Sequence, residues 1–447
     1  MNFKVRKISR NQQKIKNKWW RRWVRYFGPK LSVVLAIIIS LSIVFGIASA
    51  IMSSDFHFAQ KTRDILSLGP LSQDSNGHTN ILLLGVGGDG AEGGNLSDSI
   101  MIASFNPQNP SVAFLSLPRD LFIPSKIGER KLNEIYAAAR YKHGDRKGLE
   151  IIKSAISEFS GIRIHYGAVI NFKVFEEVVD ALNGIEIFVP TDIEDPFYPD
   201  RDYGYQTFVI RKGLQHLDGA TALKYARSRK TSSDYDRAQR QQDLILALRK
   251  RAEDLSLLTD FGKLTEFFQI YRKHVNTDLG LTQVVALAKM GLAIDYSNAV
   301  SAVLNDDVMK RGGFLFTPAM EFYGGQYVLL PENLKDTQTF LDLVLIHPEI
   351  LLENAQISVL NGSKLEGKAS KIAERLRRLG LHIIEVGNYD SDIPVYKTFL
   401  KNFTPEKTLK TTNFLASLLE TSHLENVLVE SIDPNNLIDI QIILGTN

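Results

Sequence analysis

The chain has 447 residues, of which 44% are hydrophobic and 23% are charged, and its formal net charge at pH 7 is +3. This length allows two or three domains with sizeable cores. Eleven Lys and Arg residues and no acidic residue lie in residues 1–30, so the remaining chain carries eight more acidic than basic residues, a balance that disfavours a nucleic-acid-binding protein.

The N-terminal part of the sequence predicts a membrane anchor. Residues 31–52 contain no charged residue, and a helix of this length would span about 33 Å, close to the ~30 Å hydrocarbon core of a bilayer. The basic residues 1–30 precede it, so the positive-inside rule predicts a cytoplasmic N-terminus and an extracellular remainder. A cleaved signal peptide is the alternative, but the apolar run is longer than a usual signal-peptide core. We therefore expect a single-pass protein of the cell membrane, with residues 53–79 as a linker.

Residues 80–335 show the alternation of strands and helices that is typical of an α/β domain. In chain order we expect strands at 80–86, 99–106, 111–118, 165–172 and 185–190, and helices at 132–142, 149–161 and 173–184. A polar, aromatic hairpin is expected at 192–212, a helical region from Asp243 to about Val303, and a closing strand at 324–331. This order predicts a three-layer sandwich with a mixed central sheet.

Residues 355–447 predict a second, smaller α/β domain. Apolar runs indicate strands at 357–363, 381–387, 425–431 and 439–445, and helical patterns occupy 364–380 and 411–420. The fold expected for the whole chain is thus a transmembrane helix, a large α/β domain and a small α/β domain.

The stretch from Leu223 to Gln242 concentrates guanidinium groups. It contains Arg227, Arg229, Arg237, Arg240 and the polar Gln241. So many like charges repel one another unless an anion of high charge density lies among them, and Arg supplies planar, bidentate donors for phosphate oxygens. We expect Asp218 to cap a helix that ends at Arg227, and a second helix to place Arg237 and Arg240 on the face that continues into leucines. A solvated, charge-rich helix is the alternative, but the shared face favours an anion-binding pocket.

Three other segments are candidates to join this pocket. The glycine-rich loop after the first strand offers Asp89, and Asp98 lies at the start of the next strand; carboxylates of this kind suit Mg²⁺. Arg119 and Asp120 directly follow a buried strand, at the end where α/β sites usually lie. Lys131 is a further candidate for a phosphate contact. Taken singly, these residues also fit a polar loop, a surface turn and a solvated lysine.

Several motifs in a fixed order resemble a known family. They are GVGGDG, LSDSIM, SLPRD, KLNEIYA, VVDALNGIEI, LDGATALKYARSR and DYDRAQRQQ. Together they resemble the LytR-CpsA-Psr family of cell-wall glycopolymer transferases over roughly residues 80–335. Residues 355–447, with VLNGS, AERLRRLG and IILG, resemble the LytR C-terminal domain.

The resemblance implies a membrane-anchored, Mg²⁺-dependent phosphotransferase. Such an enzyme moves a glycopolymer phosphate from a polyprenyl-pyrophosphate carrier to a sugar hydroxyl of peptidoglycan. Carried over by motif, the catalytic residues are Asp98, Arg119, Arg227 and Arg229, the pyrophosphate-binding residues are Lys131, Arg237, Arg240 and Gln241, and the metal ligands are Asp98 and Asp89.

One position departs from the family pattern. Gly87 stands where the family usually has an aspartate after the first strand, and Asp89 is the candidate to take its place. This departure keeps open a non-catalytic module that binds lipid-linked or anionic wall polymer. A polyprenyl-pyrophosphate pyrophosphatase, with water as the acceptor, is the other alternative. A transcription attenuator is disfavoured by the acidic, outward-facing part of the chain.

Overall fold

The computed structural model describes residues 71–87, 96–106, 111–199, 204–228, 275–280, 299–363, 365–390, 393–422, 424–426 and 437–446, with isolated helical positions between 244 and 287. The anchor predicted at 31–52 lies outside these residues. None of the helices in the described ranges combines the length and apolar composition that a membrane crossing requires.

A six-stranded mixed sheet forms the centre of the first part of the chain, in the order β11-β6-β1-β2-β3-β12. Its strands are β1 (Thr79–Val86), β2 (Ser97–Asn106), β3 (Ser111–Leu117), β6 (Tyr166–Asn171), β11 (Val275–Thr277) and β12 (Val300–Val303). The neighbours β1, β2 and β3 are antiparallel, whereas β6 runs parallel to β1 and β12 parallel to β3. The prediction of a mixed α/β sheet is therefore confirmed.

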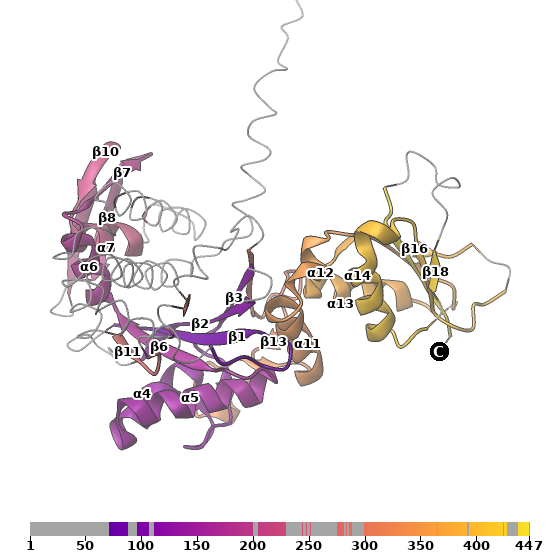
Figure 1. The fold of residues 1–447 in the computed structure, drawn as a ribbon, viewed down its shortest axis with the longest axis horizontal. Coiled ribbons are helices and arrows are strands. Elements are labelled where there is room, and N and C mark those ends of the chain that lie inside the picture. Colours follow the sequence, from indigo (N-terminus) through magenta and orange to yellow (C-terminus); the bar gives the residue numbers. More distant parts are fainter. Residues whose placement is uncertain are drawn as a thin grey trace, which may run out of the picture.

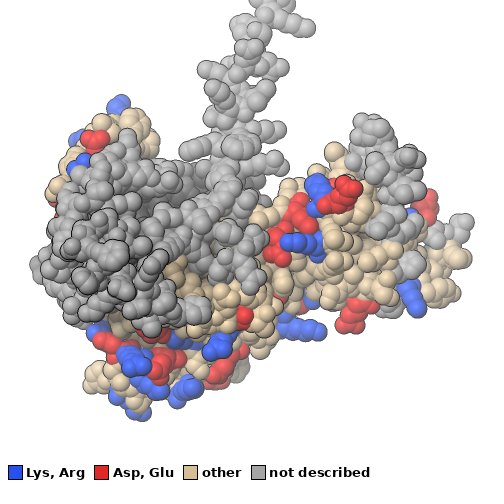
Figure 2. Space-filling model, viewed as in Figure 1, with Lys and Arg blue, Asp and Glu red and all other residues tan. Residues whose placement is uncertain are grey.

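The central strand β1 is buried on both faces because helices cover both sides of the sheet. Leu82 and Leu84 belong to a core with α4 (Leu132–His143), α5 (Asp145–Ser160) and α11 (Leu334–Leu345). The alternate residues Ile81 and Leu83 belong to a second core with α6 (Phe172–Ala181) and α7 (Gly219–Arg227). Figure 1 shows α4 and α5 on one side of the sheet and α6 and α7 on the other, which is the three-layer arrangement. Figure 2 shows acidic and basic side chains interspersed on the surface of α4 and α5.

The layer that contains α6 and α7 is extended by two short ribbons. In one, β7 (Ile185–Val189) pairs with β10 (Gly213–Leu217), and in the other β8 (Ile193–Pro199) pairs with β9 (Tyr205–Ile210), which confirms the predicted hairpin. The two helices approach so closely that a Cβ added to Gly219 would lie 2.1 Å from the carbonyl oxygen of Glu176. Glycine is therefore the residue that this helix crossing accommodates.

Two predictions for the later part of this unit hold only in part. The region from Asp243 to about Val303 was predicted to be helical, and helical positions are described at 244, 247, 251, 283, 286 and 287, but the region also contributes both edge strands of the sheet, β11 and β12. The stretch 324–331 was predicted to be the closing strand of the domain, but only β14 (Leu330–Pro331) is a strand there, and it pairs with β13 (Leu315–Phe316). Strands of two to four residues are too short to show a period, so the sequence pattern does not reveal them.

A second sheet of five strands lies in the C-terminal part, in the order β16-β15-β19-β17-β18. Its elements are β15 (Gln356–Asn361), α13 (Lys368–Leu379), β16 (His382–Asn388), β17 (Phe399–Asn402), α14 (Pro405–Leu418), β18 (Leu424–Asn426) and β19 (Ile440–Leu444). The strand β17 was not predicted. α12 (Pro348–Leu352) leads into this part, and Arg375 of α13 donates to Asp336 of α11 at 2.6 Å. Buried residues of the two parts form one continuous core.

Candidate functional site

Charged residues gather at the edge of the central sheet where β1 and β3 end and β2 begins. The antiparallel register places Val86 opposite Ser97 and Leu117 opposite Ile100. Asp98, the second residue of β2, and Arg119, two residues beyond β3, therefore come to the same edge. Strand ends of this kind are where α/β folds usually build their sites.

Four side chains form an alternating chain of ion pairs at this edge, which we call the sheet-edge cluster (Asp98, Arg119, Asp120 and Lys131). Nη1 of Arg119 lies 3.1 Å from Oδ1 of Asp98, and Nε of Arg119 lies 3.4 Å from Oδ2 of Asp120. Nζ of Lys131 lies 3.0 Å from Oδ1 of the same Asp120. The structure thus brings together Asp98, Arg119 and Lys131 of the predicted site residues, and the neighbouring candidate Asp120 bridges the two cations.

The backbone beneath the cluster is held by the first turn of α4. The amide N–H of Leu132 donates to the carbonyl of Leu121 at 2.7 Å, and that of Asn133 donates to the carbonyl of Arg119 at 3.1 Å. The amide of Leu329 donates to the carbonyl of Asp120 at 2.9 Å. The first N–H groups of a helix have no partner within the helix, so here they fix the turn that carries Arg119 and Asp120.

Two side chains of the cluster are exposed to solvent and two are largely buried. The side chains of Arg119 and Asp98 are 56% and 50% exposed, whereas those of Asp120 and Lys131 are 21% and 17% exposed. Burial by itself would lower the pKa of the Arg119 guanidinium, but the carboxylates of Asp120 and Asp98 outweigh it and raise the pKa above its ordinary value. The guanidinium is therefore firmly charged and reachable by an anionic ligand.

Two buried polar atoms of residues close in sequence to the cluster have no hydrogen-bond partner among the described residues. They are Oγ of Ser97, next to Asp98, and Oδ1 of Asn133, in the first turn of α4. Leaving such an atom unsatisfied costs about 1–3 kcal/mol. Proteins tolerate this kind of local conflict most often at functional sites. The buried Ser97 was not predicted, because a serine at the start of a strand gives no signal of its burial.

The beginning of the arginine stretch is fixed by hydrogen bonds at both ends of α7. Oδ1 of Asp218 accepts from the amide of Thr221 at 2.8 Å, which confirms the predicted cap of the helix that ends at Arg227. The next residue, Ser228, is fully buried, and its hydroxyl donates to Oδ2 of the buried Asp195 at 2.8 Å. Ser228, the last described residue of this stretch, is thus tied to β8.

Several predicted site residues lie outside the described residues. They are Asp89, Arg229, Arg237, Arg240 and Gln241, together with the side chain of Arg227. Their convergence on the sheet-edge cluster therefore stays a prediction.

The described residues offer one of the predicted ligands for Mg²⁺. Within the described ranges, no group of three or more His, Cys, Asp or Glu side chains is arranged to hold a metal ion. Asp98 nevertheless fits the chemistry of magnesium, because its carboxylate is half exposed and a single described side chain, Arg119, donates to it. Magnesium commonly binds through one or two carboxylates together with substrate phosphates and water.

Comparison with known proteins decides the family. The sequence model of the LytR_cpsA_psr family matches residues 45–311, which is more than half of the chain. The chain belongs to the LytR_cpsA_psr family. The resemblance inferred from the motifs is thereby confirmed, and the sheet-edge cluster lies within the matched range of this family member.

Relatives of this LytR_cpsA_psr protein are found among curated proteins and solved structures. An uncharacterized protein of Staphylococcus aureus (strain NCTC 8325 / PS 47) is 30% identical over 253 residues, 55% of this chain and 59% of that protein. The polyisoprenyl-teichoic acid–peptidoglycan teichoic acid transferase TagU of Bacillus anthracis (strain CDC 684 / NRRL 3495) is 31% identical over 213 residues, 47% of this chain and 63% of TagU. The chain thus spans about three fifths of the length of these relatives. The crystal structure of B. subtilis TagV is 23% identical with a TM-score of 0.41, covering 61% of this chain and 98% of TagV.

Proposed function

We propose that this family member is a phosphotransferase that moves a glycopolymer phosphate from a polyprenyl-pyrophosphate carrier to a sugar hydroxyl of peptidoglycan. Family membership and a relative named as a teichoic acid transferase support this reaction class. The observation that carries the proposal is the half-exposed pair of Arg119 and Asp98 at the edge of the central sheet. A fixed cation beside an accessible carboxylate suits a reaction that needs both an anion-binding group and a proton acceptor.

The proposed chemistry depends on positioning and neutralisation of charge. Phosphoryl transfer requires little covalent participation by the protein. Arg119 and Lys131 would hold the diphosphate from the sheet edge, and the arginines of the stretch 227–240 with Gln241 would add further contacts to it. Guanidiniums in fixed positions also stabilise the negative charge that shifts onto the leaving phosphate.

The bond changes balance without a further reactant. The acceptor oxygen forms a bond to the phosphorus that carries the glycopolymer, and the P–O bond to the carrier phosphate breaks. Asp98, or Asp89, would take the proton of the acceptor hydroxyl as it attacks. Bound Mg²⁺, held by Asp98 with Asp89, would supply charge neutralisation on the leaving phosphate.

The proposal includes a location at the cell membrane, with the catalytic part on the outer face. A transmembrane helix at 31–52 would keep the catalytic part beside the lipid carrier on the outer face of the membrane. Residues 355–447 would be a LytR C-terminal domain, and the five-stranded sheet in this range is compatible with such a small α/β unit.

An assay with the purified full chain tests the proposal. A polyprenyl-pyrophosphate glycan is incubated with peptidoglycan oligomers, with Mg²⁺ or with EDTA, and the phosphodiester-linked conjugate is measured. We expect conjugate in the presence of Mg²⁺ and its loss in EDTA. Release of glycopolymer phosphate without conjugate would instead establish the pyrophosphatase. Binding of the lipid-linked glycan without turnover would establish the binding module that Gly87 keeps open.

The arginine stretch is tested in the same assay. Arg227→Ala and Arg229→Ala should each abolish turnover, because each removes a guanidinium from the proposed diphosphate site. Arg211→Ala is the matched control, since Arg211 is an exposed arginine that pairs with Asp192 on the β8–β9 ribbon. Undiminished transfer by both Arg227→Ala and Arg229→Ala would remove the stretch from the active site.

A further inference from the structure

A cavity of about 360 Å³ lies beside the sheet-edge cluster. It is lined by Phe122, Glu129, Arg130, Glu134, Phe322, Tyr323 and Gln326. Its residues come from β4 (Phe122–Ile123), from β5 (Arg130–Lys131) and the residue before it, from the first turn of α4, and from the 3-10 helix η2 (Met320–Tyr323) and the turn after it. Cavities of about 300–1,000 Å³ are the usual size of small-ligand sites.

Aromatic rings form one wall of this cavity. The rings of Phe122 and Tyr323 pack edge to face, with centroids 5.2 Å apart and planes at 77°. Phe322 is 83% exposed, although the turn that carries it is ordered by hydrogen bonds from the amide of Phe322 to Ala319 and from Gly325 to Met320. The exposed ring of Phe322 therefore adds apolar surface to the aromatic wall, on a turn whose backbone is fixed by hydrogen bonds.

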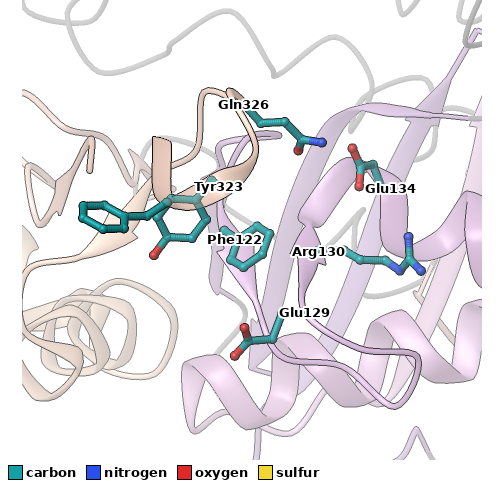
Figure 3. Close-up of a pocket in the computed structure, with 7 residues that line it drawn as sticks. Phe122, Glu129, Arg130, Glu134, Tyr323 and Gln326 are labelled. Atoms are coloured by element: carbon teal, nitrogen blue, oxygen red, sulfur yellow. The ribbon is translucent and has the colours of Figure 1, made fainter. Parts of the chain in front are cut away.

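Hydrogen-bond donors and acceptors line the cavity together with the aromatic rings. The carboxylates of Glu129 and Glu134 accept hydrogen bonds, the guanidinium of Arg130 donates, and the amide of Gln326 does both. Figure 3 shows the Phe122 ring in the middle of the pocket, with Glu134 and Gln326 at one end and Glu129 at the other. The charges of these groups sum to −1, so the cavity is poorly suited to a phosphate.

The cavity and the sheet-edge cluster share the same backbone. Phe122 of β4 pairs with Lys131 of β5, and Phe122 directly follows Leu121, the neighbour of Asp120. The segment that carries η2 is joined to this ribbon, because the amide of Phe122 donates to the carbonyl of Leu329 at 2.9 Å. A ligand in the cavity would thus lie next to the proposed site of phosphoryl transfer.

We propose that this cavity is a subsite for a pyranose ring of the acceptor glycan, an inference that rests on the proposed function and extends it to the acceptor. The aromatic faces would pack against the C–H face of the sugar, and the carboxylates and the amide would bind its hydroxyls. The net negative charge favours the neutral sugars of an acceptor over the phosphate-bearing donor. A protonated amine on an aromatic wall is the competing ligand chemistry, but Arg130 in the lining opposes it.

Direct binding tests the subsite independently of catalysis. The probe is a neutral β-1,4-linked N-acetylglucosamine oligosaccharide, titrated by calorimetry into the purified full chain. Phe322→Ala should weaken binding about tenfold, because the exposed ring contributes contact area to the sugar and none to the core. Phe188→Ala is the matched control, since Phe188 is 68% exposed on β7 and outside the cavity. Absence of binding to the wild-type chain, or equal loss in both variants, would overturn the proposal.

The variant Glu134→Gln tests whether the cavity binds a sugar or a cation. The substitution keeps a hydrogen-bonding side chain and removes a charge, so oligosaccharide binding should fall less than about threefold. A lysine-containing peptide should bind neither protein detectably. Binding of that peptide to the wild-type chain, abolished by Glu134→Gln, would show that the cavity takes a cation and would overturn the sugar assignment.

Transfer kinetics separate the acceptor from the donor. Phe322→Ala should raise the KM for the peptidoglycan acceptor about tenfold and leave the KM for the polyprenyl-pyrophosphate donor unchanged. A raised donor KM with an unchanged acceptor KM would assign the cavity to the donor glycan instead. If the wild-type chain catalyses no transfer, the proposed function fails while the calorimetric result for the cavity still stands on its own.

Discussion

Two clusters of charged residues at strand ends, both within the described part of the chain, differ in how many hydrogen bonds their carboxylates accept. In the C-terminal sheet, Asp439 is 6% exposed and lies immediately before β19. Its carboxylate accepts from the amide of Gln356 at 2.9 Å, from Oγ1 of Thr404 at 2.9 Å and from Nζ of Lys407 at 3.0 and 3.1 Å. In the sheet-edge cluster, Asp98 is half exposed and accepts from one described side chain, Arg119.

This difference separates a structural charge from one that is available to a ligand. The hydrogen bonds of Asp439 join the start of β15, the end of β17 and α14, so its carboxylate stabilises the C-terminal sheet. The ion pair of Asp98 and Arg119 is accessible to solvent, and exposed pairs contribute only about 0–1 kcal/mol to stability. The first cluster should therefore respond to substitution by unfolding, and the second by losing function.

The largest expected effect is on catalysis at the exposed cluster. Arg119→Ala should lower kcat/KM for glycopolymer transfer roughly 100-fold or more, because it removes a fixed donor to the transferring phosphate. Arg119→Lys should restore little of the rate, since an ammonium lacks the planar, bidentate geometry of the guanidinium. The rates are measured with the polyprenyl-pyrophosphate donor and peptidoglycan acceptor described above.

Arg211→Ala serves as the control for Arg119→Ala. Both arginines are exposed and both pair with an aspartate, at 3.1 Å and 3.0 Å. The unfolding midpoints in urea should be close to that of the wild type for both variants. A variant with Arg119→Ala that transfers glycopolymer at the wild-type rate would contradict the role of the sheet-edge cluster.

The next effect is on stability at the satisfied cluster. Asp439→Ala should lower the free energy of unfolding by about 1–3 kcal/mol, because it leaves the partly buried donors of Gln356 and Thr404 without their acceptor. Asp98→Asn should change it by less than about 0.5 kcal/mol, as expected for an exposed position. Urea denaturation followed by circular dichroism measures both, and equal losses would show that exposure does not distinguish the two carboxylates.

The smallest effect is the response to acid. Burial by itself would raise the pKa of Asp439, but the backbone hydrogen bond from Gln356 and the side chains of Lys407 and Thr404 outweigh it and hold the pKa below its ordinary value of 3.8. The ionised carboxylate therefore stabilises the fold at pH values above 3.8, and this stabilisation is lost as the pH falls below 3.8 through the folded-state pKa.

Unfolding experiments between about pH 5 and pH 2 follow this loss. The wild-type chain should lose more stability over this range than the variant Asp439→Asn, which has no carboxylate to protonate at that position. Parallel curves for the two proteins would contradict a depressed pKa at Asp439.

Much of the fold could be predicted because its elements are long and strongly patterned. The strands predicted at 80–86, 99–106 and 111–118 correspond to β1, β2 and β3, each seven to ten residues long. The edge strands β11 and β12 have three and four residues, and they were missed because pairing with β6 and β3 defines them. Local pattern is informative for long elements, whereas short ones depend on tertiary pairing.

Some residues of the candidate site could be predicted from the sequence, whereas their contacts could not. Asp98 was singled out because it lies at the start of a strand and Arg119 because it follows the end of one, and the sheet register brings them within 3.1 Å. The bridging position of Asp120 could not be predicted, since it depends on which way adjacent side chains turn. The contact between Phe122 and Tyr323 joins residues about 200 positions apart, and no local pattern indicates such a contact.

The sequence by itself determined the reaction class to propose. The reason is that the ability of a side chain to bind phosphate depends on its residue type, and these residue types occur in a recognisable order along the chain. It also determined the long strands and helices, since the spacing of apolar residues within each element indicates its type. Only the tertiary structure decided that the carboxylate of Asp98 is accessible to a ligand, whereas that of Asp439 is buried and accepts several hydrogen bonds. It also decided that an aromatic cavity adjoins the sheet-edge cluster. The reason is physical: the number of donors around a carboxylate and the walls of a cavity come from segments far apart in the chain, and folding alone brings them together.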